Sequence, residues 1–138
     1  APAPMENVMT NSPYIEQTVV IGDKRNYISA LIVPSFEAVE KYLNEQGKTM
    51  PGNEDLVENQ DIISLIRQQV DNAMEGFSNY ERVKEFVLLP RLFTLDKGEL
   101  TPTLKVVRKV VLKNFSTSVE KIYGASNTSE EQMEAELF

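Results

Sequence analysis

The chain has 138 residues, of which 41% are hydrophobic and 25% are charged, so its length and composition suit one compact domain with its own core. It contains no cysteine and no histidine, which excludes disulfides and thiol nucleophiles and argues against serine triads and zinc-dependent hydrolysis. The net charge of −7 argues against nucleic-acid binding as the main function, and no apolar run approaches the roughly 18 residues of a membrane-spanning helix.

The first third of the chain predicts a short helix followed by a β-hairpin. Apolar residues recur at helical spacing after Pro4, and the polar triplet 11–13 ends that pattern. The runs 15–22 and 27–33 flank a polar turn, so they predict two strands paired as a hairpin. Both runs are nearly continuous in apolar residues at their centres, which indicates burial on both faces of the sheet.

The middle of the chain predicts two helices separated by a polar surface loop. Ser35 can cap a helix directly after the second strand. The loop covers 48–59 and contains a Pro-Gly turn signal. The clearest helical periodicity lies in 62–77, with Asn59 or Asp61 as its cap.

The last third predicts a third strand and two further helices. The strand covers 84–95, and Pro90 within it indicates an edge position or a bend. The triplet 101–103 (TPT) is a helix-start signal, and a short last helix is predicted at 119–123. The apolar face of the first of these helices consists of Leu104, Val107, Val111 and Phe115.

This order of elements predicts an α+β domain with a small, mainly antiparallel three-stranded sheet packed with helices. We expect the domain to cover residues 1–124. The remainder, 125–138, is predicted to be an acidic C-terminal tail, because 130–136 carries four Glu and no cation.

Lys105 is the first candidate for chemistry, because it stands just after the predicted helix start. The N-terminal end of a helix already carries partial positive charge, so a lysine there is unfavourable unless an anion is bound. Backbone N–H groups and the ammonium could together hold a phosphate or a carboxylate. The alternative is a surface lysine on the solvated face of the helix, and spacing alone favours this alternative.

Other basic residues give a weaker signal. Arg108, Lys109 and Lys113 follow on the same predicted helix, where they could form a patch for the phosphates of a nucleotide or of coenzyme A. A solvated helix face is the alternative that the pattern alone favours. Lys24 and Arg25 in the predicted hairpin turn could also touch a phosphate, although a plain turn is the default interpretation.

The carboxylates and the aromatic residues give no comparable signal. Asp96, Glu99 and the run 130–136 could supply acid–base pairs or metal ligands, but no spacing among them defines a site, so solvated surface is favoured. Spacing predicts core positions for the aromatic residues Tyr27, Phe36, Phe77, Phe86, Phe93 and Phe115.

Two segments, 12–34 and 86–109, closely resemble the C-terminal domain of AMP-forming long-chain fatty-acid–CoA ligases, within the adenylate-forming superfamily. Segments 80–86 and 119–123 fit as well, so the resemblance extends over nearly the whole chain. The segment 98–105 (GELTPTLK) is quite specific for the long-chain branch, whereas the strand patterns alone are not.

The resemblance implies a two-step reaction and a mobile domain. Such ligases join a fatty acid to ATP, giving acyl-adenylate and pyrophosphate, and then transfer the acyl group to coenzyme A with release of AMP. Their small C-terminal domain swings between two orientations, one for each half-reaction. Lys105 matches the lysine that contacts the substrate carboxylate and the α-phosphate region. Arg108 matches the basic residue that follows it, and Arg108 and Lys109 are candidates for cofactor binding.

The resemblance also implies what this chain needs from elsewhere. The large N-terminal domain would carry the phosphate-binding loop, the acyl pocket, the adenine site and the magnesium ligand. A glycine-containing loop that helps to line the coenzyme A tunnel is missing as well. ATP, Mg²⁺ and coenzyme A are therefore expected for the full-length enzyme, with none bound to this chain, and we expect no turnover by the chain alone. Residues 106–107 (VV) stand where related sequences often carry a further lysine.

Two alternatives stay open beside the ligase. One is a non-catalytic interaction module of the same fold, whose basic helix binds an acidic surface. The other is the corresponding domain of an adenylate-forming enzyme with a different acid substrate. We expect no nucleic-acid partner, no secretory signal and no transmembrane segment, and hence a cytoplasmic protein for which peripheral membrane attachment stays open. If the ligase interpretation holds, Lys105 should be exposed or even disordered, with no pocket around it, because the anion it reaches belongs to another domain.

Overall fold

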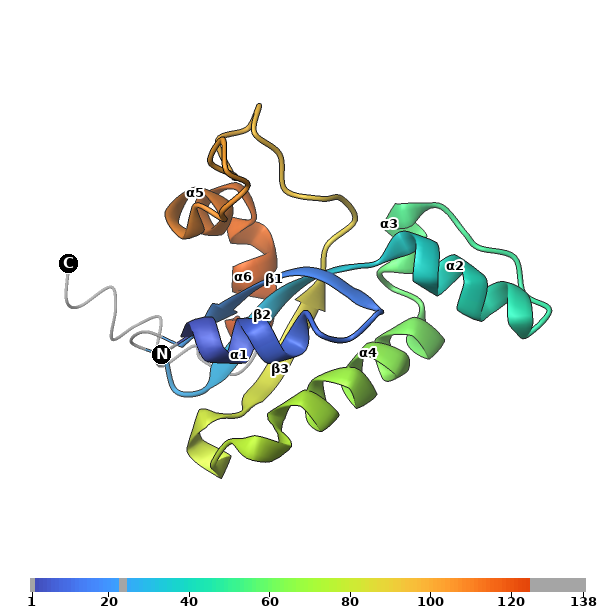
Figure 1. Cartoon of the computed structure of the whole chain (residues 1–138), viewed down its shortest axis with the longest axis horizontal. Helices are drawn as coiled ribbons and strands as arrows, with labels where there is room; N and C mark the ends of the chain where they lie inside the picture. Colours follow the sequence, from blue (N-terminus) through green and yellow to red (C-terminus); the bar gives the residue numbers. More distant parts are fainter. Residues whose placement is uncertain (1, 23–24, 125–138) are drawn as a thin grey trace.

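A three-stranded sheet forms the centre of the molecule, and a computed structural model describes residues 2–22 and 25–124. In spatial order the strands are β1 (Ile15–Ile21), β2 (Ile28–Pro34) and β3 (Val83–Leu88) (Figure 1). β1 and β2 form the predicted antiparallel hairpin, in which Val19 lies opposite Leu31. The predicted α+β class with a three-stranded sheet is therefore confirmed.

The third strand differs from the prediction in direction and length. β3 pairs with β2 in parallel, so the sheet is mixed. The parallel direction arises because residues 35–82 form a crossover that brings the chain back to the edge of the sheet where β2 begins. β3 ends at Leu88, and the Leu89 N–H still donates to the Ile32 carbonyl at 2.8 Å. Pro90 has no N–H to continue the pairing, which explains why the predicted strand stops there.

Helices cover both faces of the sheet, as the apolar centres of the first two strands predict. α1 (Pro2–Met9) and α4 (Gln60–Ala73) lie on one face, and α5 (Arg108–Asn114) and α6 (Ser116–Tyr123) lie on the other (Figure 1). Val20 and Ala30 pack toward α1 and α4, whereas Val19 and Leu31 pack toward α5 and α6. The six aromatic residues predicted to be core belong to, or pack against, these two clusters.

The crossover contains the helices that the middle of the chain predicts. α2 (Phe36–Glu45) is capped by Ser35, whose Oγ accepts from the Ala38 N–H at 3.3 Å. α4 is capped by Asn59, whose Oδ1 accepts from the N–H groups of Asp61 and Ile62. The predicted cap Ser35 is confirmed, and of the two predicted alternatives for α4 the structure selects Asn59 over Asp61. Short helical turns complete the crossover as α3 (Asn53–Leu56), η1 (Met74–Gly76) and η2 (Asn79–Glu81).

The predicted helix after the triplet 101–103 begins later than expected. α5 starts at Arg108, and the residues before it form a loop. Thr101 Oγ1 accepts from the Lys105 N–H at 3.1 Å instead of capping a helix, and Leu104 has a left-handed φ of 65°. Both features oppose a right-handed helix here. Leu104 therefore leaves the predicted apolar face, to which Val111 still belongs.

The last predicted helix is confirmed as α6, which Gly124 follows. The predicted acidic tail 125–138 lies outside the described residues, as does Lys24 of the hairpin turn.

Replacing the α4 cap should destabilise the domain. We expect Asn59→Ala to lower the free energy of unfolding by about 1 kcal/mol, because the first turn of α4 loses the acceptor for two N–H groups. Chemical denaturation measures the difference. The control Asn44→Ala changes an exposed side chain of α2 and should cause no loss, so equal losses in the two variants would contradict the assigned role of Asn59.

Candidate functional site

Residues 99–107 form a closed, hairpin-like loop between the sheet and α5. The Val107 N–H donates to the Glu99 carbonyl at 2.8 Å, and the Thr101 N–H donates to the Lys105 carbonyl at 2.8 Å. An isolated antiparallel bridge joins Leu100 and Val106 between these two bonds. The loop therefore has a defined backbone although most of its side chains are exposed.

Lys105 lies on the exposed outer part of this loop. Within 2–22 and 25–124, its ammonium takes part in no hydrogen bond or ion pair. The predicted position at a helix N-terminus is wrong, because α5 starts at Arg108, so a helix dipole does not account for this lysine. What remains is an exposed cation on a well-defined loop.

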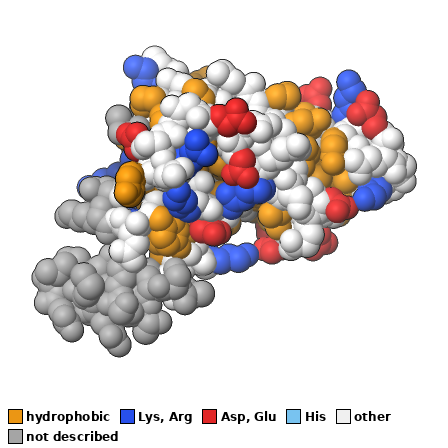
Figure 2. Space-filling model, turned by 90° about the horizontal axis from the view of Figure 1, so that it is seen from below, with side chains coloured by type: hydrophobic (Ala, Val, Ile, Leu, Met, Phe, Trp, Pro, Cys, Tyr) orange, Lys and Arg blue, Asp and Glu red, His pale blue; other side chains and the backbone are white. Residues whose placement is uncertain are grey.

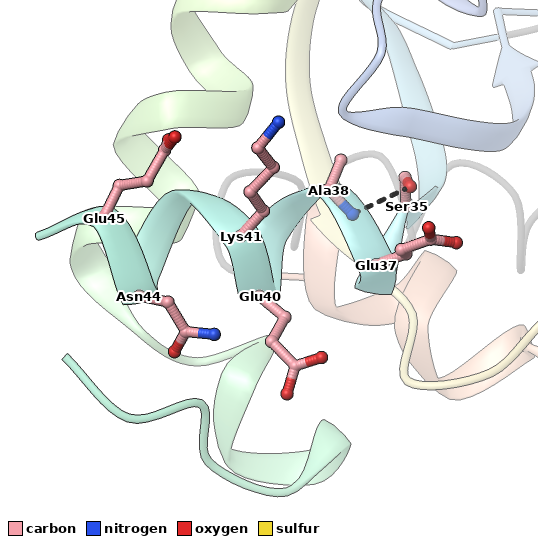
Figure 3. Close-up of a pocket in the computed structure, with 7 residues that line it drawn as sticks. All are labelled: Ser35, Glu37, Ala38, Glu40, Lys41, Asn44 and Glu45. Atoms are coloured by element: carbon pink, nitrogen blue, oxygen red, sulfur yellow. Dashed lines mark hydrogen bonds between the residues drawn. The ribbon is translucent and has the colours of Figure 1, made fainter. Parts of the chain in front are cut away.

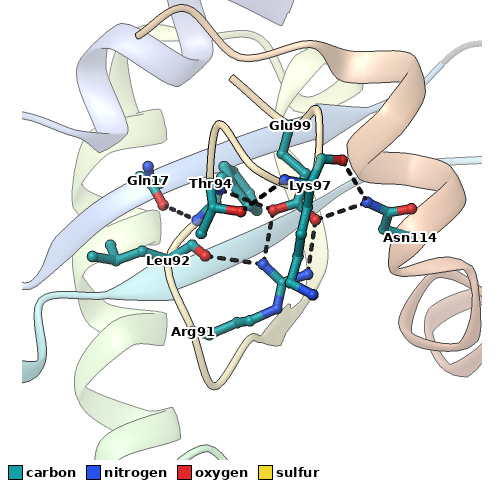
Figure 4. A network of polar contacts seen from close by, with 8 residues as sticks. Gln17, Arg91, Leu92, Thr94, Lys97, Glu99 and Asn114 are labelled. Atoms are coloured by element: carbon teal, nitrogen blue, oxygen red, sulfur yellow. Dashed lines mark hydrogen bonds and ion pairs between the residues drawn. The ribbon is translucent and has the colours of Figure 1, made fainter. Parts of the chain in front are cut away.

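Glu99 holds the base of the loop with a buried carboxylate (Figure 4). Its side chain is 0% exposed, and Arg91 binds both carboxylate oxygens through Nη1 and Nη2, at 2.7 Å each. The Thr94 N–H donates to Oε1 at 3.0 Å, and Asn114 Nδ2 of α5 donates to Oε2 at 2.9 Å. The expectation that Glu99 belongs to the solvated surface is therefore wrong.

The Arg91–Glu99–Asn114 network, defined by these three side chains, is connected to the sheet. The Phe93 N–H donates to Gln17 Oε1 of β1 at 2.8 Å. The Arg91 guanidinium also lies over the Phe115 ring, 4.6 Å from its centroid. Glu99 thus joins the loop to α5, and the backbone of Phe93, next to Thr94 in the chain, is held to β1. Sequence spacing contains no signal for it, because its members come from separate segments.

The charge on Glu99 is favoured despite its burial. Hydrogen bonds from Arg91, with smaller contributions from Asn114 and the Thr94 N–H, together lower the pKa of Glu99 to about 2 against the opposing effect of burial. The carboxylate is therefore ionised at neutral pH. It is fully engaged in holding the loop, which leaves it unsuited to act as a general base.

The predicted basic stripe does not converge on one place. Arg108 donates to the Val20 carbonyl of β1 and to Glu6 Oε2 of α1, at 2.7 Å each. Glu6 Oε2 also accepts from the Val20 N–H, so Arg108 and Glu6 together satisfy both backbone groups of an edge-strand residue. Lys109 and Lys113 are exposed on α5. On the face that Figure 2 shows, Lys and Arg side chains are interspersed with Asp and Glu.

A cavity of about 530 Å³ opens between α1, the end of β1 and α5. Its lining combines apolar side chains, Met5 and Leu112 among them, with Arg25 and Arg108. Both guanidinium groups already have contacts, since Arg25 lies 4.5 Å from the Tyr123 ring centroid and Arg108 binds Glu6. The predicted phosphate contact of Arg25 therefore stays a prediction.

A second hollow lies on the outer surface of α2 (Figure 3). It is lined by Glu37, Glu40 and Glu45, with Lys41 as the single cation among its lining residues. This excess of carboxylates would repel a phosphate or a fatty-acid carboxylate. No group of three or more acidic side chains suitable for holding a metal ion occurs in the described part of the chain. No helix within residues 2–22 and 25–124 is both long enough and apolar enough to span a bilayer.

The Glu99 carboxylate should make the stability of the domain sensitive to acid. A group whose pKa is lower in the folded than in the unfolded chain stabilises the fold above its unfolded pKa, and this contribution is lost as the pH falls. We therefore expect a loss on the order of 3 kcal/mol between pH 4.5 and about 2. In Glu99→Gln this part of the acid dependence should be absent, and stability at neutral pH should already be lower.

Denaturation curves at several pH values measure the effect. The control Glu85→Gln changes an exposed carboxylate on β3 and should leave the pH dependence as it is. A Glu99→Gln variant with the same acid dependence as the parent chain would contradict the assignment.

Comparisons with known proteins place this chain among domains of adenylate-forming enzymes. The family of AMP-binding enzyme C-terminal domains matches residues 1–127. The long-chain-fatty-acid–CoA ligase FadD15 of Mycobacterium tuberculosis is 41% identical over 124 residues, which cover 89% of this chain and 21% of that protein. The human long-chain-fatty-acid–CoA ligase 1 is 29% identical over 127 residues, covering 89% of this chain and 18% of that protein. The chain thus spans about a fifth of the length of these relatives.

Solved structures support the fold. The adenylation domain of carboxylic acid reductase from Segniliparus rugosus, determined with AMP and a carboxylic acid, superposes with a TM-score of 0.72 at 24% identity. The superposition covers 91% of this chain and 18% of that chain. The resemblance derived from segments 12–34 and 86–109 is confirmed. Since the family match extends from residue 1 to residue 127, this chain belongs to the family of AMP-binding enzyme C-terminal domains.

Proposed function

We propose that this chain is the C-terminal domain of a longer AMP-forming long-chain fatty-acid–CoA ligase and that Lys105 is its catalytic residue. The observation that carries the proposal is the exposed Lys105 ammonium, which has no partner within the described residues although its loop is well defined. Relatives named as long-chain-fatty-acid–CoA ligases support the reaction and the acid substrate. We propose 1–124 as the extent of the domain and 125–138 as its tail.

The proposed reaction has two steps. In the first, a fatty-acid carboxylate oxygen attacks the α-phosphorus of ATP, and the bond to the departing pyrophosphate breaks. In the second, the thiol of coenzyme A attacks the acyl carbon, and AMP leaves. ATP, Mg²⁺ and coenzyme A would be held mainly by the remainder of the ligase, which also supplies the acyl pocket.

Lys105 would act in the first step. There, an anionic carboxylate approaches an anionic phosphate, and their repulsion is strong in a site from which water is excluded. A positioned ammonium between them offsets that repulsion and stabilises the charge that develops on the phosphate oxygens. Lys105 is exposed in this chain, so we propose that the chain alone does not turn over and that the domain swings onto the rest of the ligase.

Arg108 and Lys109 would have different roles. Lys109 is exposed and free to meet a phosphate group, so we keep it as a proposed cofactor contact. Arg108 is already bound to Glu6 and to the Val20 carbonyl, so we propose that it first holds α5 against α1 and β1. Its contact with a cofactor would have to use the part of the guanidinium that these bonds leave exposed.

Removing the Lys105 ammonium should separate the two half-reactions. In the full-length ligase we expect Lys105→Ala to slow acyl-adenylate formation by about 10²–10³, because one preorganised charge contact is lost. Thioester formation from supplied acyl-adenylate should stay near the parent rate. Pyrophosphate exchange and thioester assays measure the two steps. Lys97→Ala, an exposed lysine of the same region, is the matched control.

Equal losses in both steps would contradict the assignment of Lys105. A full-length protein without any adenylation would favour a non-catalytic interaction module. Adenylation of short or aromatic acids in preference to long-chain acids would favour an enzyme with a different acid substrate.

Replacing Arg108 should mainly lower the stability of the domain and should change the binding of coenzyme A less. We expect Arg108→Ala to lower the free energy of unfolding by about 1–2 kcal/mol, because Glu6 and the Val20 carbonyl lose a charged donor in a partly exposed site. Thermal denaturation measures it, with Lys109→Ala as the exposed control that should leave stability unchanged. Unchanged stability together with weaker binding of coenzyme A would instead support a cofactor contact for Arg108.

A further inference from the structure

The buried carboxylate of Glu99 is more than the fold alone requires. Burying a charged pair is expensive, and well-packed apolar side chains of similar volume often stabilise a protein as well or better. What a bidentate pair with additional hydrogen bonds supplies is direction, since each oxygen of Glu99 must meet its donors at fixed angles. The question is therefore which part of the molecule needs this fixed geometry.

A short series of contacts leads from this carboxylate to Lys105. The Glu99 carbonyl accepts from the Val107 N–H, and the Lys105 carbonyl accepts from the Thr101 N–H two positions further along the loop. On the other side, Asn114 ties Glu99 to α5, the helix that directly follows the loop. Both ends of the Lys105 loop are thus attached to one buried residue, Glu99: Val107 binds its backbone carbonyl, and Asn114 of α5 binds its carboxylate.

The outer part of the loop needs such an attachment. Leu104, next to Lys105, has a left-handed backbone conformation that a branched side chain rarely adopts, and its side chain is 66% exposed. Local strain of this kind persists only where the surrounding structure determines the conformation. Two sets of contacts determine the conformation here. One is the pair of backbone hydrogen bonds across the loop, and the other, at its base, is the Arg91–Glu99–Asn114 network.

We infer that Glu99 is a positioning residue for Lys105: its buried carboxylate, held by Arg91 and Asn114, fixes the loop that carries the ammonium in the orientation needed for adenylation. The inference rests on the proposed function of Lys105. Displacing a catalytic ammonium by about 1 Å can slow the reaction by on the order of 10². Loosening the base of the loop should therefore slow adenylation.

The test is a double-mutant cycle between Glu99 and Lys105 in the full-length ligase. Glu99→Gln keeps the shape of the side chain but removes its charge, and we expect adenylation to fall by about 10–100-fold while thioester formation from supplied acyl-adenylate changes little. In the Lys105→Ala background the same substitution should cause no further loss of adenylation, because a residue that acts through Lys105 has nothing left to position.

Asn114→Ala provides a second variant in case Glu99→Gln does not fold. It removes the bond from α5 to the Glu99 carboxylate, together with the longer 3.4 Å bond to the Lys97 carbonyl, and leaves the Arg91–Glu99 pair in place. We therefore expect a smaller, several-fold loss of adenylation and again none in the Lys105→Ala background. Glu85→Gln on β3 is the control for loss of a carboxylate and should leave both half-reactions unchanged.

Four results would overturn the inference. Parallel losses in both half-reactions, in step with a loss of folded protein, would mean that the network acts on the fold alone. Further losses in the Lys105→Ala background would mean that Glu99 does not act through Lys105. Unchanged adenylation in Glu99→Gln and Asn114→Ala, with Lys105→Ala strongly impaired, would remove the positioning role and leave the proposed function intact. If Lys105→Ala itself is unimpaired, the proposed function fails, and the inference fails with it.

Discussion

A carboxylate that is removed from water must find its donors within the protein, and at Glu99 this requirement organises the whole region between β3 and α6. The two Arg91 nitrogens, the Thr94 N–H and the Asn114 amide occupy both carboxylate oxygens. Because these donors come from the segment after β3 and from α5, ionised Glu99 fixes their mutual positions. The loop that carries Lys105 starts and ends at this point, which allows its exposed part to be well defined without a core of its own.

The sheet provides the frame to which this network is attached. Its two buried faces hold α1 and α4 on one side and α5 and α6 on the other, so a change at α5 is resisted by packing against β1 and β2. Arg108 adds a second polar attachment, from the start of α5 to Glu6 and Val20. A domain built in this way can move as one body, which is the property that the proposed swing onto the rest of the ligase requires.

Local patterns predicted much of this fold because they report on local physics. Continuous apolar centres in 15–22 and 27–33 predicted a hairpin buried on both faces, and Ser35 and Asn59 predicted helix caps that the structure confirms. The same logic failed at the triplet 101–103, where Thr101 binds the Lys105 N–H and Leu104 turns left-handed. A helix-start signal and a tight loop use the same residue types, and only the surrounding contacts decide between them.

The sequence by itself determined the class of fold, the family and the presence of an exposed Lys105 in a recognisable segment, because periodicity, capping and motif identity are properties of neighbouring residues. Tertiary structure alone decided the parallel direction of β3, the burial of Glu99 and the binding of Arg108 to Glu6 and to the Val20 carbonyl. Each of these depends on residues far apart in the chain, such as Glu6 and Arg108, or on donors from separate segments. Their contact energies exist only once the chain has folded.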